Sequence, residues 1–136
     1  MNAFAALPDS VFTIENGIKY IKSKTKNYFA AVDCTSDIPT NATINENCKV
    51  IAACAFIECT SIESITIPDS VINVNYSAFS ACSSLTTITV KEGTETTFTC
   101  TLPYDYTLTN GETSTTAPSG TAITRSASGD NVYTKK

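Results

Sequence analysis

The chain has 136 residues, six cysteines, no His and no Trp, and its formal net charge is -4 with a pI near 4.6. This length accommodates one domain, and the acidic balance argues against sequence-independent nucleic-acid binding, which needs a basic face that displaces counterions. No apolar run approaches the roughly 18 residues of a membrane span, so membrane insertion is not expected. The opening residues 1–8 lack the basic start and the long apolar stretch of a signal peptide; alone, they predict a processed or an intracellular chain.

The first predicted element is a β-hairpin over residues 12–23. Apolar and polar residues alternate on both sides of Asn16-Gly17, and Asn-Gly is the preferred pair for a type I′ turn because both central residues need positive φ. A second extended stretch, Tyr28 to Val32, follows a polar linker. Residues 1–36 are therefore interpreted as an N-terminal hairpin cap, which would cover the open end of a stack of repeats.

A basic cluster lies within this first region, formed by Lys19, Lys22, Lys24 and Lys26. One interpretation is a contact for a polyanion. The other, which is favoured, is a solvated strand face on which lysines discourage pairing of the strand edge with other chains.

The middle of the chain, residues 37–93, contains an internal repeat with a fixed period. Ala-Phe-x-x-Cys-x-x-(Ile/Leu)-x-x-Ile-x-(Ile/Val) spans residues 55–67 and recurs at residues 78–90. Ala42 and Ile44 lie one period before Ile65 and Ile67, so a degenerate strand precedes the two clear repeats. A period of this size is typical of stacked coils that bury their apolar residues against one another. The pattern predicts about two and a half coils, with Phe56 stacked on Phe79.

Each repeat is expected to supply a short strand with a defined inner and outer side. Ile65 and Ile88 are predicted to stack and to point inward, and Pro68 is predicted to end its strand because proline cannot donate to a ladder. Asn75 occupies a place where the turn would need a left-handed residue, which Asn tolerates well.

After Val90 the composition changes, and more than a third of the positions from 94 to 124 are Thr. Apolar and polar residues alternate on either side of Pro103, so residues 94–111 are predicted to form a C-terminal β segment, about one hairpin packed on the last coil. Residues 112–136 are rich in Ser, Thr, Ala and Gly and have few apolar residues. They are interpreted as a flexible tail or an O-glycosylated stalk, two alternatives that composition does not separate.

The cysteines follow the repeat rather than a metal-binding pattern. Cys59 and Cys82 lie one period apart among apolar positions, so both are expected inside the coils as small buried thiols. Cys48 occupies the place of Val71 one repeat earlier and is also expected to point inward, whereas Cys54 matches Ser77. No CxxC pair and no His occur, so neither a metal site nor a cofactor is predicted. If crosslinks form, they are expected among Cys34, Cys48, Cys54 and Cys100.

The repeat motif resembles the BspA-like leucine-rich repeat family. The family signature Ala-Phe-x-x-Cys-x-x-(Ile/Leu)-x-x-Ile-x-Ile-Pro-x-x-Val is present from Ala55 to Val71 and again, without its Pro-x-x-Val end and with Val at its last position, from Ala78 to Val90, and the hairpin at residues 12–20 is similar to a cap that precedes such repeats. The resemblance implies a β-rich leucine-rich-repeat solenoid. Because members occur on bacterial and protist surfaces and some mediate adhesion, it also implies an extracellular or cell-surface protein.

The leading functional hypothesis is a non-catalytic binding module that adheres to a protein or glycan partner. The predicted contact face comprises the outward strand residues Ser64, Thr66, Thr87 and Thr89 with Glu63 beside them, and Tyr76, Tyr104 and Tyr106 are candidate aromatic anchors. The opposing interpretation is that these polar residues only keep a small sheet soluble. An enzyme is not expected, because the sequence has no His, no phosphate-binding glycine loop and no visible base to activate a cysteine. The alternative function is a structural repeat or capping fragment that extends a longer solenoid or self-associates through its ends.

Overall fold

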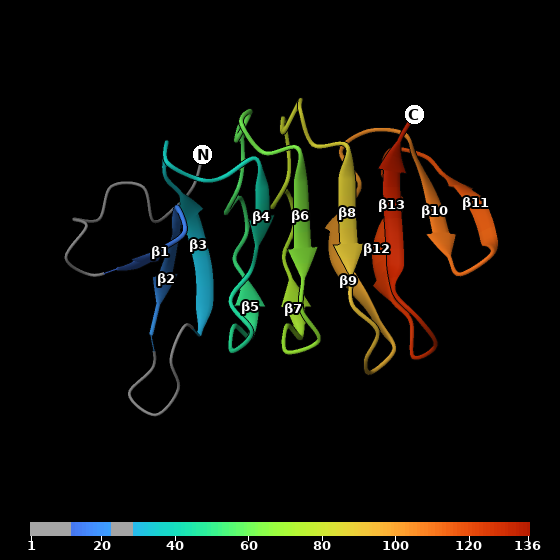
Figure 1. Ribbon diagram of the computed structural model, residues 1–136, viewed down its shortest axis with the longest axis horizontal. Helices are drawn as coiled ribbons and strands as arrows, with labels where there is room; N and C mark the ends of the chain where they lie inside the picture. The colour runs from blue at the N-terminus through green and yellow to red at the C-terminus, as the bar shows by residue number, and fades with distance from the viewer. Residues whose placement is uncertain (1–11, 23–28) are drawn as a thin grey trace.

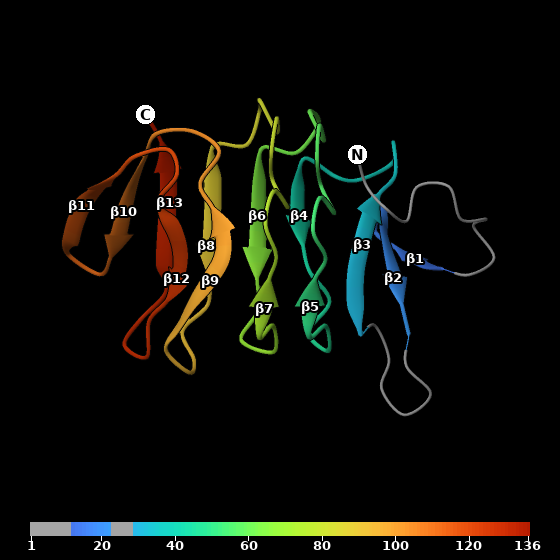
Figure 2. The same ribbon diagram turned by 180° about the vertical axis from the view of Figure 1, so that it is seen from behind.

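The computed structural model describes residues 12–22 and 29–136, and in these ranges every regular element is a strand. The strands form two layers that run along the molecule, with the N-terminal strands at one end and the β10–β11 hairpin at the other (Figure 1, and from behind in Figure 2). The predictions made for residues 1–8, Lys24, Lys26 and Tyr28 fall outside the described residues. No helix in the described ranges has the length and apolar character that crossing a membrane would require.

One layer begins with the N-terminal hairpin. It contains β1 (Thr13–Glu15), β2 (Ile18–Ile21), β3 (Ala30–Cys34), β5 (Val50–Ile51) and β7 (Asn73–Val74), in the spatial order β1-β2-β3-β5-β7. The predicted hairpin is confirmed, since β1 pairs with β2 around Asn16 and Gly17, whose φ values are 49° and 76°. Gly17 is required for space as well as for φ, because a Cβ there would stand 2.2 Å from the Ile38 Cα.

The other layer contains the parallel strands of the repeat, β4 (Asn41–Thr43), β6 (Ser64–Ile67) and β8 (Thr87–Val90). Their register confirms the period seen in the sequence, because Ile65 lies opposite Ile88 and Ala42 lies opposite Ile65. The rings of Phe56 and Phe79 stack with centroids 5.7 Å apart. The β-rich repeat architecture expected from the sequence is therefore present, and the core lies between the two layers.

The prediction that Asn75 provides a left-handed residue is wrong. Positive φ occurs two residues later, at Ser77, and at the equivalent Cys54 one repeat earlier, with values of 57° and 59°. Asn75 still belongs to the ladder between coils, because its backbone N–H and its side-chain amide both donate to the Ile51 carbonyl, at 3.0 and 3.1 Å. The turn therefore begins only after this residue.

The C-terminal region does not form the single hairpin predicted within residues 94–111. Its strands are β9 (Thr96–Thr101), β10 (Tyr106–Asn110), β11 (Thr113–Ala117), β12 (Ala122–Arg125) and β13 (Asn131–Lys135). β9 pairs with β12, whereas β10 pairs with β11 and β13 in the other layer. The chain changes layers at Pro103, which has no N–H to continue a ladder, while the preceding Leu102 donates its N–H to the Thr121 carbonyl at 2.8 Å.

Residues 112–136 also differ from the expected tail, because they contribute three strands. β13 lies between β8 and β10, so the spatial order of the large sheet is β11-β10-β13-β8-β6-β4 (Figure 1). Tyr133 is buried on β13, and its hydroxyl accepts a hydrogen bond from the Thr124 N–H at 3.0 Å. The composition of this region does not indicate a strand, because the other residues of β13 are mostly polar and Tyr133 is its one inward aromatic residue.

A buried arginine joins the last coil to the C-terminal strands. Arg125 is 3% exposed and donates to three backbone carbonyls: from Nε to Lys91 at 3.0 Å, from Nη2 to Pro68 at 2.6 Å, and from Nη1 to Val71. Its guanidinium also lies 5.3 Å from the centre of the Phe98 ring. These contacts satisfy the carbonyls of Pro68 and Val71 in the turn after β6 and the carbonyl of Lys91 directly after β8.

Candidate functional site

The outward side of the six-stranded sheet carries two rows of small polar side chains. The strand register aligns them across the sheet, one row being Asn41, Ser64, Thr87, Thr134, Thr107 and Thr116 and the other Thr43, Thr66, Thr89, Val132, Thr109 and Ser114. Five residues in each row bear a hydroxyl group, which makes 10 of 12 positions. We call these two rows the hydroxyl face.

The hydroxyl face is a regular array because it is built on paired strands. Neighbouring strands in a sheet lie about 4.8 Å apart, and residues on the same side of one strand are separated by about 6.7 Å. Some side chains also bond to each other: Ser64 donates to the Asn41 amide oxygen at 2.8 Å, and the Thr109 and Ser114 hydroxyls lie 3.0 Å apart. All members of the two rows are exposed or half-buried, so the array is open to a partner.

A groove adjoins the hydroxyl face where the parallel strands end. Its volume is about 890 Å³. Two members of the hydroxyl face line it together with residues that follow β4, β6 and β8 and that precede β13: Thr43, Ile44, Glu46, Asn47, Thr66, Pro68, Asp69, Lys91, Glu92, Gly129 and Asp130. Four carboxylates against one ammonium give this lining a formal charge of -3, and we call it the acidic groove.

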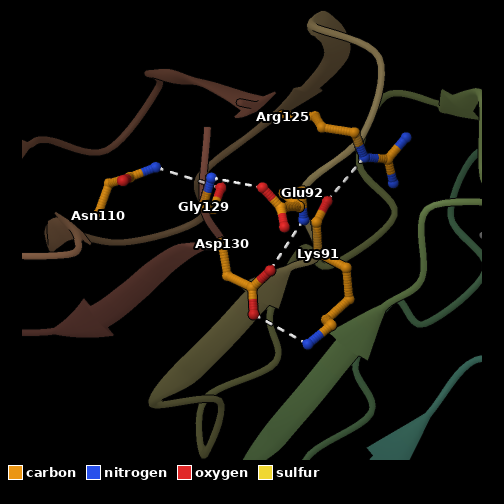
Figure 3. Close-up of polar contacts among 6 residues, drawn as sticks. All are labelled: Lys91, Glu92, Asn110, Arg125, Gly129 and Asp130. Atoms are coloured by element: carbon orange, nitrogen blue, oxygen red, sulfur yellow. Dashed lines mark hydrogen bonds and ion pairs between the residues drawn. The ribbon is translucent and has the colours of Figure 1, made fainter. Parts of the chain in front are cut away.

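One wall of the acidic groove is fixed by a chain of hydrogen bonds (Figure 3). The Lys91 ammonium donates to Asp130 Oδ2 at 2.9 Å, and the Glu92 N–H donates to Asp130 Oδ1 at 2.9 Å. The Glu92 carboxylate in turn accepts from the Gly129 N–H at 2.8 Å. Asn110 of β10 donates to the Gly129 carbonyl at 3.3 Å, so the wall connects the end of β8 to the C-terminal strands.

The same contacts set the ionisation of the wall. The hydrogen bond from Lys91 holds the pKa of the Asp130 carboxyl below its usual value, with help from the Glu92 N–H. The reciprocal contact raises the pKa of Lys91. Asp130 therefore carries its negative charge at neutral pH, although Lys91 compensates it locally. The uncompensated charge of the groove comes from Glu46, Asp69 and Glu92.

The structure brings together the four strand residues that sequence patterning selected. Ser64 lies opposite Thr87 and Thr66 lies opposite Thr89, all on the hydroxyl face. Glu63 is exposed just before β6, at the end of the strand away from the acidic groove.

The three tyrosines selected as anchors do not join this face. Tyr106 is fully buried and donates its hydroxyl to the Leu85 carbonyl at 2.7 Å, so its selection as a surface anchor was wrong. Tyr106 is buried because side chains alternate between the two sides of β10, and the even-numbered positions of this strand face the core. Tyr104 is half-buried, with the Lys135 ammonium 4.0 Å from its ring centre. Tyr76 is 66% exposed in the turn after β7, in the other layer.

Sequence reasoning missed more than half of the hydroxyl face and every charged residue of the acidic groove. Of the missed positions in β10, β11 and β13, only those in β10 carry a signal, namely the alternation Thr-Leu-Thr at 107–109. The groove has no comparable signal, because its carboxylates come from four separate turns. In the described ranges, no three His, Cys, Asp or Glu side chains are grouped to hold a metal ion.

The fold and the face together define a class: a β-rich repeat protein whose coils present a polar sheet to the solvent. A family model described as BspA type Leucine rich repeat region (6 copies) matches residues 1–98 and again residues 25–118. The chain belongs to the BspA-type leucine-rich repeat family. Comparisons with curated proteins and with solved structures gave no match. Leucine-rich repeat domains are generally non-catalytic scaffolds for protein interactions, and this family is typically associated with cell surfaces.

Proposed function

We propose that this chain is a non-catalytic binding module of a secreted or surface-displayed repeat protein, and that it mediates adhesion by binding a protein partner across the hydroxyl face and the acidic groove. The observation that carries the proposal is that the two rows cross all six strands of one sheet and bear a hydroxyl group at 10 of their 12 positions. An extended surface of this kind is what stacked repeats offer to a partner.

The composition of the hydroxyl face favours binding over mere solubility. None of its 12 positions carries a charge, whereas a surface that serves only solubility is rich in Lys and Glu. Lys and Glu are also depleted at the centre of protein interfaces. Thr and Ser have few rotamers to lose, so immobilising them against a partner costs little conformational entropy.

The acidic groove favours a protein partner that has a basic segment. Complementary charges steer the encounter of two proteins and fix their relative orientation. Glu46, Asp69 and Glu92 would face Lys or Arg side chains of the partner, while the hydroxyl face would contact the neighbouring backbone and polar groups. A glycan partner has less support, because the described hydroxyl face includes no aromatic side chain on which a sugar ring would stack.

A matched pair of variants tests this proposal. Thr66→Lys/Thr89→Lys adds two charges at the centre of the hydroxyl face, and Ile72→Lys/Asn73→Lys adds the same charge to exposed positions of the other layer. The probe is an immobilised peptide of alternating Lys and Ser, and binding is measured at low and high salt. We expect salt-dependent binding that drops about tenfold or more only in the hydroxyl-face variant.

An equal loss of peptide binding in both variants would contradict the proposal, because binding would then depend only on the net charge of the protein and not on the hydroxyl face. A glycan array run with the same proteins separates the partner classes. If the protein binds a glycan but not the peptide, and only Thr66→Lys/Thr89→Lys loses this binding, the hydroxyl face is the binding site but its partner is a glycan and not a protein.

A second candidate function, self-association or extension of a longer solenoid, is supported by one edge of the large sheet. β11 pairs with β10 on one side and ends the sheet on the other, and four of its five residues are exposed. An open edge presents unpaired N–H and C=O groups to another chain. Concentration-dependent dimers in sedimentation that disappear in Thr116→Pro, whose N–H faces the free edge and not β10, would favour this function, and a monomer at all concentrations would exclude dimerisation through β11.

A further inference from the structure

Two cysteines from different parts of the chain meet between the first repeat and strands β1, β2 and β3, which form the N-terminal part of the five-stranded sheet and are called the N-terminal sheet below. Cys34 is the last residue of β3, and Cys59 lies in the turn that follows Phe56. Their sulfur atoms are 3.0 Å apart across a sequence separation of 25 residues. This distance exceeds the length of a disulfide bond by only about 1 Å, so a small rotation of either side chain brings the sulfurs to bonding distance.

The pair lies closer to the solvent than the other core thiols. Cys34 is half-buried and Cys59 is 6% exposed, and both cysteines line a surface depression of about 350 Å³ beside Glu58 and Thr60. Cys48, Cys82 and Cys100, by contrast, are completely buried. A small oxidant can therefore reach Cys34 and Cys59 without unfolding the coils.

Local hydrogen bonds also favour the thiolate form of one of the two cysteines, Cys59. The Cys34 thiol donates to the Cys59 sulfur, and the Ser61 side chain and the N–H groups of Ser61 and Ile62 assist, which lowers the pKa of Cys59 to about 7. The same hydrogen bond raises the pKa of Cys34. Burial raises the pKa of Cys82 to about 12 and that of Cys100 to about 11. An attacking thiol reacts best when its pKa is near the ambient pH, and at neutral pH Cys59 satisfies this condition.

We propose that Cys34 and Cys59 form a reversible disulfide that fastens the N-terminal sheet to the first repeat. The oxidant is a small-molecule disulfide. The Cys59 thiolate attacks one of its sulfurs and releases the first small thiolate. Cys34 then loses its proton and attacks the Cys59 sulfur, which releases the second thiolate. The protein loses two thiol hydrogens, and the small disulfide is reduced to two thiols.

The position of this bond gives it a structural consequence. The parallel ladder that joins the N-terminal sheet to the repeats is short, since β3 and β5 share only the pairs Ala30↔Val50 and Ala31↔Ile51. Cys34 lies at the far end of β3, beyond this ladder. A covalent bond there closes a loop of 25 residues, which restricts the unfolded chain and raises the melting temperature of the oxidised protein.

The experiment uses the full chain, first reduced and then equilibrated with oxidised glutathione. Thiols are blocked, counted under denaturing conditions and mapped by peptide mass spectrometry. We expect four thiols in place of the six of the reduced chain, a peptide that links Cys34 to Cys59, and a rise in melting temperature of about 10 °C. In the reduced protein, alkylation of Cys59 should reach half its maximal rate near pH 7, because its pKa is about 7.

Two variants make the result specific. Cys34→Ser removes the partner thiol from a half-buried position, so no disulfide and no temperature rise are expected. Cys54→Ser is the matched control, because Cys54 lies in the same turn and Ser77 occupies its place one repeat later; it should behave like the natural sequence. Six thiols after oxidation, a crosslink of Cys59 to Cys82, or an equal temperature rise in Cys34→Ser would overturn the proposal.

Discussion

The repeats at residues 41–90 and the C-terminal strands at residues 96–135 build the same sheet by different means. In the repeats, chain order equals spatial order, and each strand lies beside its copy from the neighbouring repeat. In the C-terminal region, β13 is last in the chain and yet lies directly beside β8, ahead of β10 and β11. The repeats are stabilised by equivalent residues that stack on one another, whereas the C-terminal strands are stabilised by individual contacts between residues far apart in the sequence.

This difference shows how a short stack of repeats is completed. Roughly three or more repeats are normally needed for a continuous core, and this chain has fewer clear ones. The C-terminal strands supply a further neighbour, because β13 pairs with the edge of β8 and Arg125 of β12 bonds to the carbonyls of Pro68 and Lys91. The completed sheet then carries the hydroxyl face on both halves.

The largest predicted effect is in the repeats. Phe79→Ala removes a ring that is 1% exposed and stacked on Phe56, and such a cavity costs about 3–5 kcal/mol of unfolding free energy. Urea denaturation followed by circular dichroism measures the loss. Tyr76→Ala, at an exposed aromatic position nearby in the sequence, is the control and should leave the midpoint nearly unchanged. A small loss for Phe79→Ala would mean that the coils do not stack in this register.

A smaller but still large effect is predicted at the junction of the two regions. Arg125→Met keeps an apolar stem but removes the guanidinium donor from the carbonyls of Val71 and Lys91 and leaves the Pro68 carbonyl with only the Val71 N–H, and the expected cost is about 3 kcal/mol. The same urea titration applies, with the exposed Lys136→Met as control. If both substitutions leave stability unchanged, Arg125 does not complete the last coil.

Within the C-terminal region, the hydroxyl of Tyr133 provides a milder test. Tyr133→Phe leaves the ring in place and removes the acceptor for the Thr124 N–H, so we expect a loss of about 1–2 kcal/mol. Tyr76→Phe is the control at an exposed ring. Equal stability of the two variants would show that β12 and β13 are not joined through this hydrogen bond.

The smallest predicted effect concerns the pH dependence of the groove wall. Because the Lys91 hydrogen bond lowers the pKa of Asp130 in the folded protein, this contact stabilises the fold above the unfolded pKa of an aspartate, about 3.9. The stabilisation is lost as the pH falls through the lower folded pKa. Carboxyl titration by NMR should show the Asp130 pKa rising in Lys91→Met, and an unchanged value would remove Lys91 as the cause.

The sequence was sufficient to predict the repeat register, the Asn16-Gly17 hairpin and four members of the hydroxyl face. Those features follow from local patterns: a fixed period, a turn dipeptide and alternation along a strand. The place of β13 was not predictable in this way, because pairing over a long separation leaves no periodic trace and its only strong apolar signal is Tyr133. Likewise, the acidic groove and the Cys34–Cys59 contact depend on how distant turns meet, and the sequence carries no spacing that reports it.

The most direct test of this account is whether β13 lies between β8 and β10 in solution, since this placement unites the two halves of the hydroxyl face. Backbone nuclear Overhauser effects of the labelled full chain report it. The structure predicts contacts between Thr134 and Thr87 on one side and between Val132 and Thr109 on the other. Direct contacts between β8 and β10, with none from β13 to either, would contradict the account.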